Sequence, residues 1–577
     1  MRWRLGWTEG EDEGDARPLA RDLGLHPLVA RILARRGLSS PEAARAFLEP
    51  GLGELPDPFL FRDMERAVQR IVRAVEEGEA VVAYGDYDVD GVSSAAQLVS
   101  FLRAVGARAD WYVPHRLREG YGLNAEALER LRGQGAGLVV ALDCGIGAVA
   151  EVDRAAALGL DVVVVDHHRP SPELPRAVAV LNPLQPDCAF PEKRLAAAGV
   201  TFFLLMALRR RLRERGRFGP ARPEPNLRAF LDLVALGTVA DVVPLLGVNR
   251  RLVREGLVEL DRTRRPGIRA LCDVAGLDPQ LPLTAGQVGF RLAPRLNAAG
   301  RLDDAGLSVR LLLAEEWGDA VRLARELDRE NEQRRALEAS LTAEAMAQAE
   351  GRLASASPPK ALVLSGEGWH PGVVGIVASR VVERTGRPAL LLGLEGELAR
   401  GSGRSLAGFD LHAAVAEAGD LLDRFGGHRM AVGLQLPRSK LPALRARLEA
   451  AAAERLSDEL LGPSCHVDLP IDAAEIDERL AGDLGRLAPF GAGNPEPVFA
   501  AFGVRGKARL LAAKAEGAEP HLKVELGGRL TGIGFGLGRS LDLFSGPVDA
   551  AFHVALDEWR GRRQLQLRLR SVRAALR

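Results

Sequence analysis

The chain has 577 residues, which is more than one hydrophobic core holds, so we expect three or four domains. Hydrophobic residues make up 47% and charged residues 27% of the chain, as in water-soluble globular proteins, and no apolar run approaches the ~20 residues of a membrane span. The formal net charge is zero, so whole-chain charge gives no indication of a nucleic-acid partner.

Cysteine usage and the N-terminus indicate where the protein works. Four cysteines are scattered along the chain without a CxxC pair, which argues against a disulfide framework or a zinc site. The first 15 residues are acidic and lack an apolar signal core, so we expect no export. Both features favour a reducing cytoplasm.

The first half of the chain predicts helices followed by an α/β domain. Residues 26–75 have a helical pattern, so we assign 1–75 to an N-terminal helical segment. Within it, Ser40 followed by Pro41 is a good helix start. Continuous apolar runs then alternate with helical stretches, which predicts a parallel sheet covered on both faces in a domain spanning 76–317. The runs are 79–84, 139–142 and 161–165.

The second half predicts three further elements. Residues 318–350 are highly charged and read as a long helix that connects domains. A second α/β domain is expected over 351–460, opening with a strand at 361–364. Short β runs then predict an OB-like β-barrel over 461–577. These runs are 498–502, 522–526 and 564–568. The predicted fold class is therefore multidomain α/β with a closing β-barrel.

Three aspartates crowd the end of the first predicted strand. Asp86, Asp88 and Asp90 lie at positions i, i+2 and i+4 and run into a helix expected to begin near Gly91. Their mutual repulsion is costly unless a cation is present, and carboxylate oxygens suit Mg²⁺ and Mn²⁺. The spacing also opens an EF-hand calcium loop, but that loop needs Glu at position 12, where this chain has Gln97.

Acidic and imidazole side chains recur further along the chain. Asp143 follows the second predicted strand, and Asp166 with His167 and His168 follows the third. Ligands of open parallel sheets bind beyond the carboxyl ends of the strands, so these side chains are expected at one edge. Asp241 is a further candidate. The plain alternative for Asp143 and for Asp241 is a helix cap or a turn.

These four motifs, in this order, resemble the DHH phosphoesterase family, which is named for its Asp-His-His triplet. The resemblance implies a dinuclear Mn²⁺ or Mg²⁺ site, without deciding between the two metals. It places Asp88 and Asp143 at one ion, and Asp90, Asp143, His167 and Asp241 at the other. Asp143 is expected to bridge the ions, and His168 to lie beside the phosphate; both are candidate catalytic residues. Whether Asp86 is a sixth ligand or supports the others stays open.

Other segments resemble the branch of this family that degrades single-stranded DNA from a 5′ end. They are residues 114–123, 291–301, 368–380 and 489–497, although Leu296 stands where the branch more often has isoleucine. The resemblance spans about residues 30–565. It implies a single-stranded-DNA-specific 5′→3′ exonuclease that releases 5′-mononucleotides in recombination and repair. It further implies a monomer whose partners include single-strand-binding protein and a helicase.

The substrate contacts are predicted in both halves. Residues 401–405 read as a small-residue loop whose backbone N–H groups cradle a phosphate. Residues 425–428 resemble the family's glycine-histidine turn. Arg116, Ser402 and Arg404 are expected to form a pocket for the terminal phosphate, because arginine forks favour phosphate oxygens. The predicted substrate-binding residues are Arg116, Arg301, Ser402, Arg404, Gly426, Gly427 and His428.

The arginine cluster near the end of the predicted barrel can be interpreted in two ways. Residues 559–563 with Arg568, Arg570 and Arg573 are either a nucleic-acid surface or a solvated barrel edge.

Two other functions remain open. A family member that cleaves cyclic dinucleotides or short oligonucleotides is generally compact, whereas this chain adds N-terminal helices and a β-rich end. A DNA-binding scaffold without activity predicts lost ligands, but all of the expected ligands are present.

Overall fold

The computed structural model describes residues 2–6, 16–116, 118–302, 305–512, 519–559 and 562–575. The chain forms two compact units. One, here called the parallel-sheet unit, comprises Glu42–Glu332 with Leu487–Glu496. The other, here called the mixed-sheet unit, comprises Met1–Pro41, Gln333–Arg486 and Pro497–Arg577. The finer predicted domain boundaries stay predictions.

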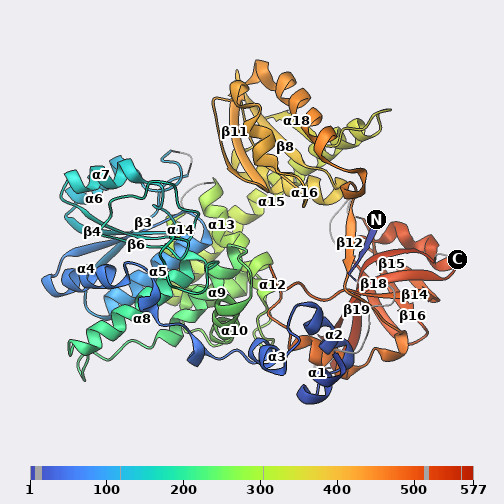
Figure 1. Cartoon of the computed structure of the whole chain (residues 1–577), viewed down its shortest axis with the longest axis horizontal. Helices are drawn as coiled ribbons and strands as arrows, with labels where there is room; N and C mark the ends of the chain where they lie inside the picture. The colour runs from blue at the N-terminus through green and yellow to red at the C-terminus, as the bar shows by residue number, and fades with distance from the viewer. Residues whose placement is uncertain are drawn as a thin grey trace. The chain divides into compact units, whose positions relative to one another are not determined.

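A fully parallel sheet forms the centre of the parallel-sheet unit (Figure 1). Its described strands follow the order β3-β2-β4-β5-β6. They are β2 (Ala80–Gly85), β3 (Arg108–Tyr112), β4 (Ala136–Leu142), β5 (Asp161–Val165) and β6 (Ala179–Leu181). The three strands that the sequence predicts lie together in the middle. The two edge strands escaped prediction because β6 is short, and β3 is partly charged and has no fully buried residue.

Helices cover both faces of this sheet, as the continuous apolar strands predict. Alternate residues of the central strands point to opposite faces: Val81 and Ala83 pack in one core, and Val82 and Tyr84 in another. The first core is covered by α4 (Met64–Glu77), α5 (Val89–Ala104) and α8 (Ala197–Glu214), and the second by α6 (Ala125–Gly133) and α7 (Val149–Ala157) (Figure 1). The doubly covered sheet fixes the strand ends that carry the acidic residues.

Further helices complete this unit and lead out of it. They include α3 (Pro41–Leu48), α9 (Leu231–Ala240), α10 (Gly247–Asp261), α11 (Pro266–Val274), α12 (Ala285–Gln287), the π-helix η5 (Val288–Leu292), α13 (Ala293–Leu302) and α14 (Gly306–Leu312). The helix start predicted at Ser40 and Pro41 is confirmed. The long connecting helix is also confirmed as α15 (Trp317–Leu353), which passes from one unit into the other.

The mixed-sheet unit contains a second α/β layer. Its described strands follow the order β10-β11-β9-β8-β7. The strands are β7 (Leu362–Glu367), β8 (Ala389–Glu395), β9 (Leu398–Arg404), β10 (Arg424–His428) and β11 (Ala431–Pro437); the helices are α16 (Pro371–Thr385), α17 (Leu411–Ala416) and α18 (Leu441–Arg455). Within this sheet, as far as it is described, β7 and β8 are parallel and the other neighbouring strands are antiparallel, so we call the unit mixed.

The last part of the chain forms an OB-like β-barrel, as predicted. Its described strands follow the order β13-β14-β18-β19-β17-β16-β15. They are β13 (Leu469–Pro470), β14 (Phe499–Val504), β15 (Gly506–Leu511), β16 (His521–Leu526), β17 (Leu530–Gly534), β18 (Val548–Trp559) and β19 (Arg562–Ala574). The N-terminal β1 (Arg2–Leu5) pairs with β12 (Ser464–Val467), and Trp3 donates its indole N–H to Ser571 of β19. The remaining helices of this unit are α1 (Ala16–Leu23), α2 (Pro27–Arg35) and α19 (Glu478–Gly485).

Two further observations bear on the composition arguments. Cys144, Cys188, Cys272 and Cys465 are all free thiols. Among the helices of the described residues, none combines the length and apolar character required to span a bilayer.

Candidate metal centre and substrate pocket

Backbone hydrogen bonds continue the central sheet by one residue and align three aspartates. Asp86 donates its backbone N–H to Leu142 O at 3.1 Å, Asp143 to Val165 O at 2.9 Å, and Asp166 to Leu181 O at 2.9 Å. The three residues therefore follow β2, β4 and β5 side by side at the carboxyl edge of the sheet. This is the convergence that the strand ends predict.

The other two aspartates of the first motif are held by helix N-termini. Asp88 caps α5 and accepts from the N–H groups of Asp90 at 2.9 Å and Gly91 at 3.2 Å. The helix thus begins at Val89, slightly before the predicted start. Asp90 is buried and accepts from the first N–H groups of α8, Ala197 at 2.6 Å and Ala198 at 2.8 Å. Helix N-termini favour carboxylates, so both side chains are oriented by the protein itself.

Gly91 is required at the start of α5. A Cβ at this position would lie 2.5 Å from the backbone nitrogen of Asp86 and 2.6 Å from its oxygen. Only glycine lets the helix approach the strand end this closely, which keeps the three aspartates of the motif together.

The His167 ring lies among three of these carboxylates. Its Nε2 is 3.1 Å from Asp143 Oδ1, 3.6 Å from Asp241 Oδ2 and 3.8 Å from Asp90 Oδ2. Possible ligand atoms within 4.8 Å of one another form three groups: Asp86, Asp88 and Asp143; Asp90, His167 and Asp241; and Asp143, His167 and His168. All six predicted metal ligands therefore lie in one cluster, with Asp143 belonging to two of the groups.

The electrostatics of this cluster fit a bound cation. Burial and then neighbouring carboxylates raise the pKa of Asp86, Asp90 and Asp143, and raise the pKa of Asp241 to about 7. Burial, followed by the charge of His168, lowers the pKa of His167 to about 4, so its imidazole is neutral at pH 7.

Three buried atoms of the cluster also lack a hydrogen-bond partner among the described residues. These atoms are Asp86 Oδ1, Asp143 Oδ1 and His167 Nε2. Buried polar atoms are nearly always satisfied, so such a group is unfavourable unless a ligand satisfies it. Oxygen-rich donors with one imidazole suit Mn²⁺ or Mg²⁺.

Asp166 holds His168 in place. Its Oδ1 accepts from the backbone N–H of His167 at 2.7 Å and of His168 at 3.0 Å, and lies 2.8 Å from His168 Nδ1. Its Oδ2 accepts from Ile146 N–H at 3.0 Å. Burial lowers the pKa of His168, but the hydrogen bond and charge of Asp166 outweigh burial and raise it to about 9. The motif was visible in the sequence, but this supporting role of Asp166 was missed.

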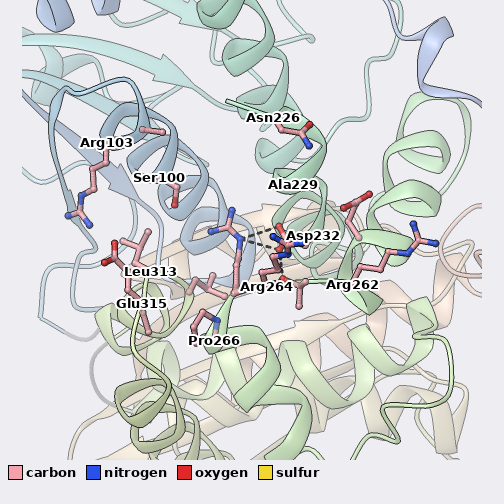
Figure 2. Close-up of a pocket in the computed structure, with 16 residues that line it drawn as sticks. Ser100, Arg103, Asn226, Ala229, Asp232, Arg262, Arg264, Pro266, Leu313 and Glu315 are labelled. Carbon is pink, nitrogen blue, oxygen red and sulfur yellow. Dashed lines mark hydrogen bonds and ion pairs between the residues drawn. The ribbon is translucent and has the colours of Figure 1, made fainter. Parts of the chain in front are cut away.

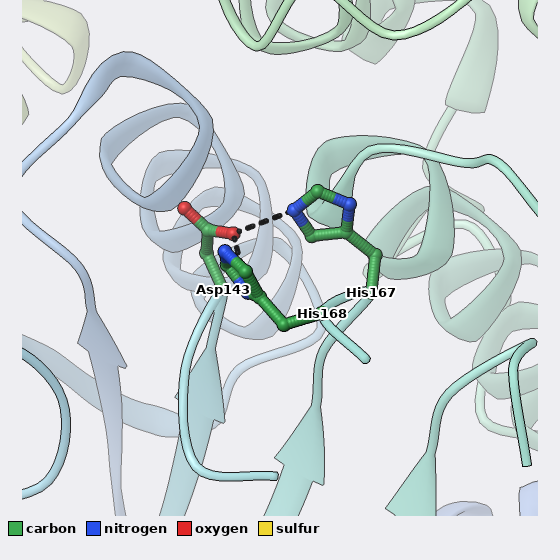
Figure 3. A group of neighbouring side chains, drawn as sticks. All are labelled: Asp143, His167 and His168. Atoms are coloured by element: carbon green, nitrogen blue, oxygen red, sulfur yellow. Dashed lines mark ion pairs between the residues drawn. The ribbon is translucent and has the colours of Figure 1, made fainter. Parts of the chain in front are cut away.

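The two histidine rings lie close together. Their centroids lie 4.5 Å apart, and both rings approach Asp143 Oδ1 (Figure 3). Their surroundings nevertheless differ. His167 is 13% exposed and faces carboxylates, whereas His168 is 38% exposed and lines a pocket.

A cavity of about 250 Å³ adjoins this cluster. Its lining residues are Asp86, Tyr87, Asp88, Arg116, Tyr121, His168, Asn297, Gly300 and Arg301. The predicted substrate residues Arg116 and Arg301 thus lie in the same pocket as candidate metal ligands and His168. The pocket is a suitable place for a phosphate, because it combines two guanidinium groups with a protonated imidazole.

Four of the lining residues, Tyr87, Tyr121, Asn297 and Gly300, were not predicted as site residues from the sequence. The Tyr121 hydroxyl donates to Asp143 O at 3.2 Å, and Asn297 Oδ1 accepts from Val89 N–H at 3.1 Å. Tyr87 lies beneath the Arg116 guanidinium, 4.9 Å from ring centroid to carbon. Tyr87 lies within the aspartate motif, and Tyr121 and Asn297 lie within the segments 114–123 and 291–301, but only their neighbours in space show that they line the pocket.

A larger cavity, about 1100 Å³, lies at the other end of α5. Its buried Asp232 is already satisfied, accepting from Thr263 at 2.8 Å and from Arg265 at 3.1 Å. Arg103 and Arg262 of its lining point away from each other (Figure 2). The charged groups of this cavity do not converge, so we do not treat it as a candidate site.

From the sequence we expect a phosphate loop at 401–405 and a glycine-histidine turn at 425–428. This secondary structure is wrong, because the structure has a strand in each place. Residues 401–404 belong to β9, which is paired with β8 on one side and β11 on the other, and residues 425–428 belong to the edge strand β10. Backbone groups of β9 are used in this pairing, so they do not cradle a phosphate. Glycine misled the prediction: side chains at Gly401 and Gly403 would collide with Leu391 and Leu390, so glycine serves close strand packing there.

The strand register nevertheless brings the predicted residues into two neighbouring rows. Arg404 is opposite Ala431, which is opposite His428; Ser402 is opposite Gly433, which is opposite Gly426. Directly opposite residues share a face, and neighbouring strands are ~4.8 Å apart. We call this face of β9, β11 and β10 the glycine-lined face. Gly427 has a φ of 135°, a conformation that side chains rarely adopt.

Arg404 is notable on this face. Burial lowers the pKa of its guanidinium, which donates to Gly403 O at 2.8 Å. No acidic side chain within the described ranges forms an ion pair with it. A half-buried guanidinium without a counter-charge favours an anionic ligand.

The arginines at the end of the barrel are only partly described. Residues 560 and 561, and the side chains of 557–563, lie outside the described part of the chain. Arg568 and Arg570 are exposed. Arg573 donates to Asp549 at 3.0 Å and lies 4.3 Å from the Trp3 ring centroid, so it has a structural role.

Comparison with known proteins agrees with this architecture. Residues 80–238 match the DHH family, N-terminal domain; residues 359–454 match the DHHA1 domain; and residues 467–571 match the RecJ OB domain. The fold and the donor set thus define a member of the DHH class.

The particular family follows from the similarity of whole chains. RecJ of Salmonella typhimurium, named as a single-stranded-DNA-specific exonuclease, is 40% identical over 559 residues, covering 94% of this chain and 95% of its own. RecJ of Bacillus subtilis is 37% identical over 580 residues, covering 99% of this chain and 71% of its own. The chain belongs to the RecJ family.

A solved structure extends the likeness to three dimensions. RecJ from Thermus thermophilus in complex with Mn²⁺ is 33% identical, with a TM-score of 0.82 over 99% of this chain and 79% of that chain. The complex of the same protein with Mg²⁺ has a TM-score of 0.76.

Proposed function

We propose that this protein is a metal-dependent exonuclease that degrades single-stranded DNA in the 5′→3′ direction and releases 5′-mononucleotides, in DNA recombination and repair. The observation that carries the proposal is the convergence of five aspartates and a neutral imidazole on one cluster with unsatisfied buried atoms. Membership of the RecJ family supports the substrate, because its curated members are named as single-stranded-DNA-specific exonucleases.

The cluster would hold two divalent cations, Mn²⁺ or Mg²⁺. Asp86, Asp88 and Asp143 would hold one, and Asp90, His167 and Asp241 the other, with Asp143 shared between them. Two such ions, when bound, activate a water and stabilise the attacking and leaving oxygens of a phosphodiester. Relatives have been solved with each metal, which supports both choices.

The chain's own residues orient the substrate. His168, held by Asp166, presents a positive imidazolium to the pocket, where a phosphate oxygen can accept from it. Arg116 and Arg301 supply further donors to the same phosphate. Positioning of this kind, rather than covalent chemistry by the protein, is what phosphodiester hydrolysis requires.

End selection would use the glycine-lined face. Arg404 lacks an acidic partner among the described residues, and Ser402 and His428 lie in adjacent rows. These residues suit a terminal phosphate, and the predicted contribution of Arg116 to the same pocket stays a prediction. Gly426 leaves the face open for the phosphate, because a Cβ there would meet nothing within 4 Å, whereas a Cβ at Gly427 would collide with the backbone oxygen of Ala431.

The proposal also covers the DNA-binding surface, the cellular compartment and the partners of the protein. The OB-like barrel, with Arg568 and Arg570 exposed, offers a surface for single-stranded DNA. Free cysteines agree with a reducing cytoplasm. Action as a monomer, with single-strand-binding protein and a helicase as partners, is proposed from the family.

The experiment that tests the function is digestion of an end-labelled single strand with Mn²⁺ or Mg²⁺. The expected result is loss of mononucleotides from the 5′ end, no attack on duplex, and no activity in chelator. Cleavage restricted to dinucleotides would instead support a phosphodiesterase for short substrates, and binding without cleavage would support an inactive scaffold.

A further inference from the structure

An aromatic side chain stands almost fully in solvent close to the metal centre. Phe290 is 86% exposed and lies in the π-helix η5, directly before α13. A phenylalanine this exposed contributes none of the free energy that burial of its ring would give. In addition, π-helical turns occur frequently at functional sites. Phe290 is one of the large apolar residues exposed in the described structure, and its place in the fold distinguishes it from the others.

Phe290 lies in the turn that leads directly into α13, the helix that lines the pocket. Asn297 and Arg301 line the 250 Å³ pocket, and they lie four residues apart on the helix. Pro294 lies three residues before Asn297 on the same face, and Phe290 lies in the π-helical turn that leads into this helix. At 1.5 Å per residue, Phe290 lies about 10 Å along the axis from Asn297. This length is about three steps of a stacked nucleotide strand.

The segment that carries Phe290 is tied to the metal centre from a second direction. A Cβ on its neighbour Gly289 would lie 3.5 Å from the Val239 side chain at the end of α9, the helix that is capped by Asp241. Val242, next to Asp241, is 69% exposed and has a φ of 60°. A β-branched residue in this conformation is strained, and such strain concentrates at functional sites.

We propose that Phe290 is a base-stacking platform for the nucleotides that follow the one held at the metal centre. The inference rests on the proposed function and specifies how a single strand is tracked beyond the pocket. Stacking on an aromatic ring tolerates any base but requires the base to be unpaired, because both faces of a paired base are occupied by its neighbours. Phe290 would therefore favour single strands over duplex within the parallel-sheet unit itself.

The test compares Phe290→Ala with the wild-type protein on a single strand, with Phe290→Trp as the matched control that keeps an aromatic face. Alanine substitution at a stacking position costs ~1–3 kcal/mol, which predicts a rise in KM of about 5- to 150-fold. The kcat at saturating DNA should stay within about twofold, and Phe290→Trp should retain the wild-type KM. The thermal midpoint of Phe290→Ala should not change, because the side chain is exposed.

Abasic substrates separate stacking from a structural effect. A single abasic nucleotide, moved through the first five positions, should weaken wild-type binding most at one position. At that position, the abasic nucleotide should not weaken DNA binding by the Phe290→Ala protein any further. An unchanged KM in Phe290→Ala, or an equal abasic penalty in both proteins, would overturn the stacking role. If the wild-type protein degrades no single strand with either metal, the proposed function itself fails, which is a different outcome from an unchanged KM.

Discussion

The metal centre and the glycine-lined face place their residues in opposite ways. At the metal centre, side chains from separated segments are buried within 3.1–3.8 Å of His167 Nε2 and leave atoms without hydrogen-bond partners. On the glycine-lined face, Ser402 and His428 are positioned by strand register, and β10 is exposed throughout.

This difference decides how much each region reveals about its ligand. A buried cluster of carboxylates is unfavourable in an empty protein, so its presence is itself evidence of a cation. An exposed row of small and polar residues has no such cost. Its interpretation therefore depends on Arg404, the one half-buried charge on that face without an acidic partner among the described residues.

The largest effect should come from Asp143→Asn. Asp143 has a φ of 63°, which asparagine tolerates, so the backbone should be retained while the shared ligand is lost. We expect kcat to fall by about 10³-fold or more. In the wild-type protein, Mn²⁺ at about 100 times its Kd should raise the free energy of unfolding by ~2.7 kcal/mol, and this increment should largely disappear in the variant.

The matched control for that variant is Asp232→Asn. Asp232 is also a buried aspartate, but Thr263 and Arg265 satisfy it. The free energy of unfolding should fall by about 1–3 kcal/mol, with the Mn²⁺-dependent increment unchanged. If Mn²⁺ raised the free energy of unfolding of Asp143→Asn and of the wild-type protein equally, the unsatisfied Asp143 carboxylate would not be a metal ligand.

A smaller effect is expected from Asp166→Asn, because Asp166 acts through His168. An amide cannot replace all four interactions of this carboxylate, so the His168 ring should lose its orientation and its raised pKa. Loss of an outer supporting group typically costs up to about 100-fold. We expect this loss in kcat, with KM changed by less than about threefold. A fall confined to KM would show that Asp166 serves binding rather than orientation.

On the glycine-lined face, Arg404→Ala should reduce kcat/KM by about 10-fold or more on 5′-phosphorylated single strands, as for loss of a charge-assisted hydrogen bond. Strands with a 5′-hydroxyl should be much less affected. Arg438→Ala is the control, because Arg438 forms an exposed ion pair with Glu367 in the same unit and should change neither rate. An equal loss of kcat/KM on 5′-phosphorylated and 5′-hydroxyl strands would show that Arg404 does not select the 5′ end.

The smallest effect should come from filling the face at Gly433. This glycine lies between Ser402 and Gly426, and a Cβ there meets nothing within 4 Å. Gly433→Leu should raise KM a few-fold, with the thermal midpoint almost unchanged, and Gly433→Ala should have a weaker effect in the same direction. If KM did not depend on the size of the side chain at position 433, the substrate would not contact this face.

Local sequence patterns predicted most of the fold and the acidic candidate residues, whereas the family resemblance assigned the ligands to the two ions and supplied the glycine-histidine turn. Strand ends at Asp86, Asp143 and Asp166 were readable because buried parallel strands are continuously apolar and stop abruptly at charged residues. The partly exposed, partly charged β3 and the glycine-rich β9 were missed or misread, because their side chains resemble those of loops.

The sequence by itself determined which chemical groups are available: five aspartates and two histidines in a fixed order, at the ends of apolar runs. Only the tertiary structure decided their individual roles. The Asp90 carboxylate is oriented by the N-terminus of α8, 107 residues away, and Val89 N–H is bound by Asn297, 208 residues away. Residue periodicity reports local burial, whereas hydrogen bonds across such separations depend on how helices pack on the sheet.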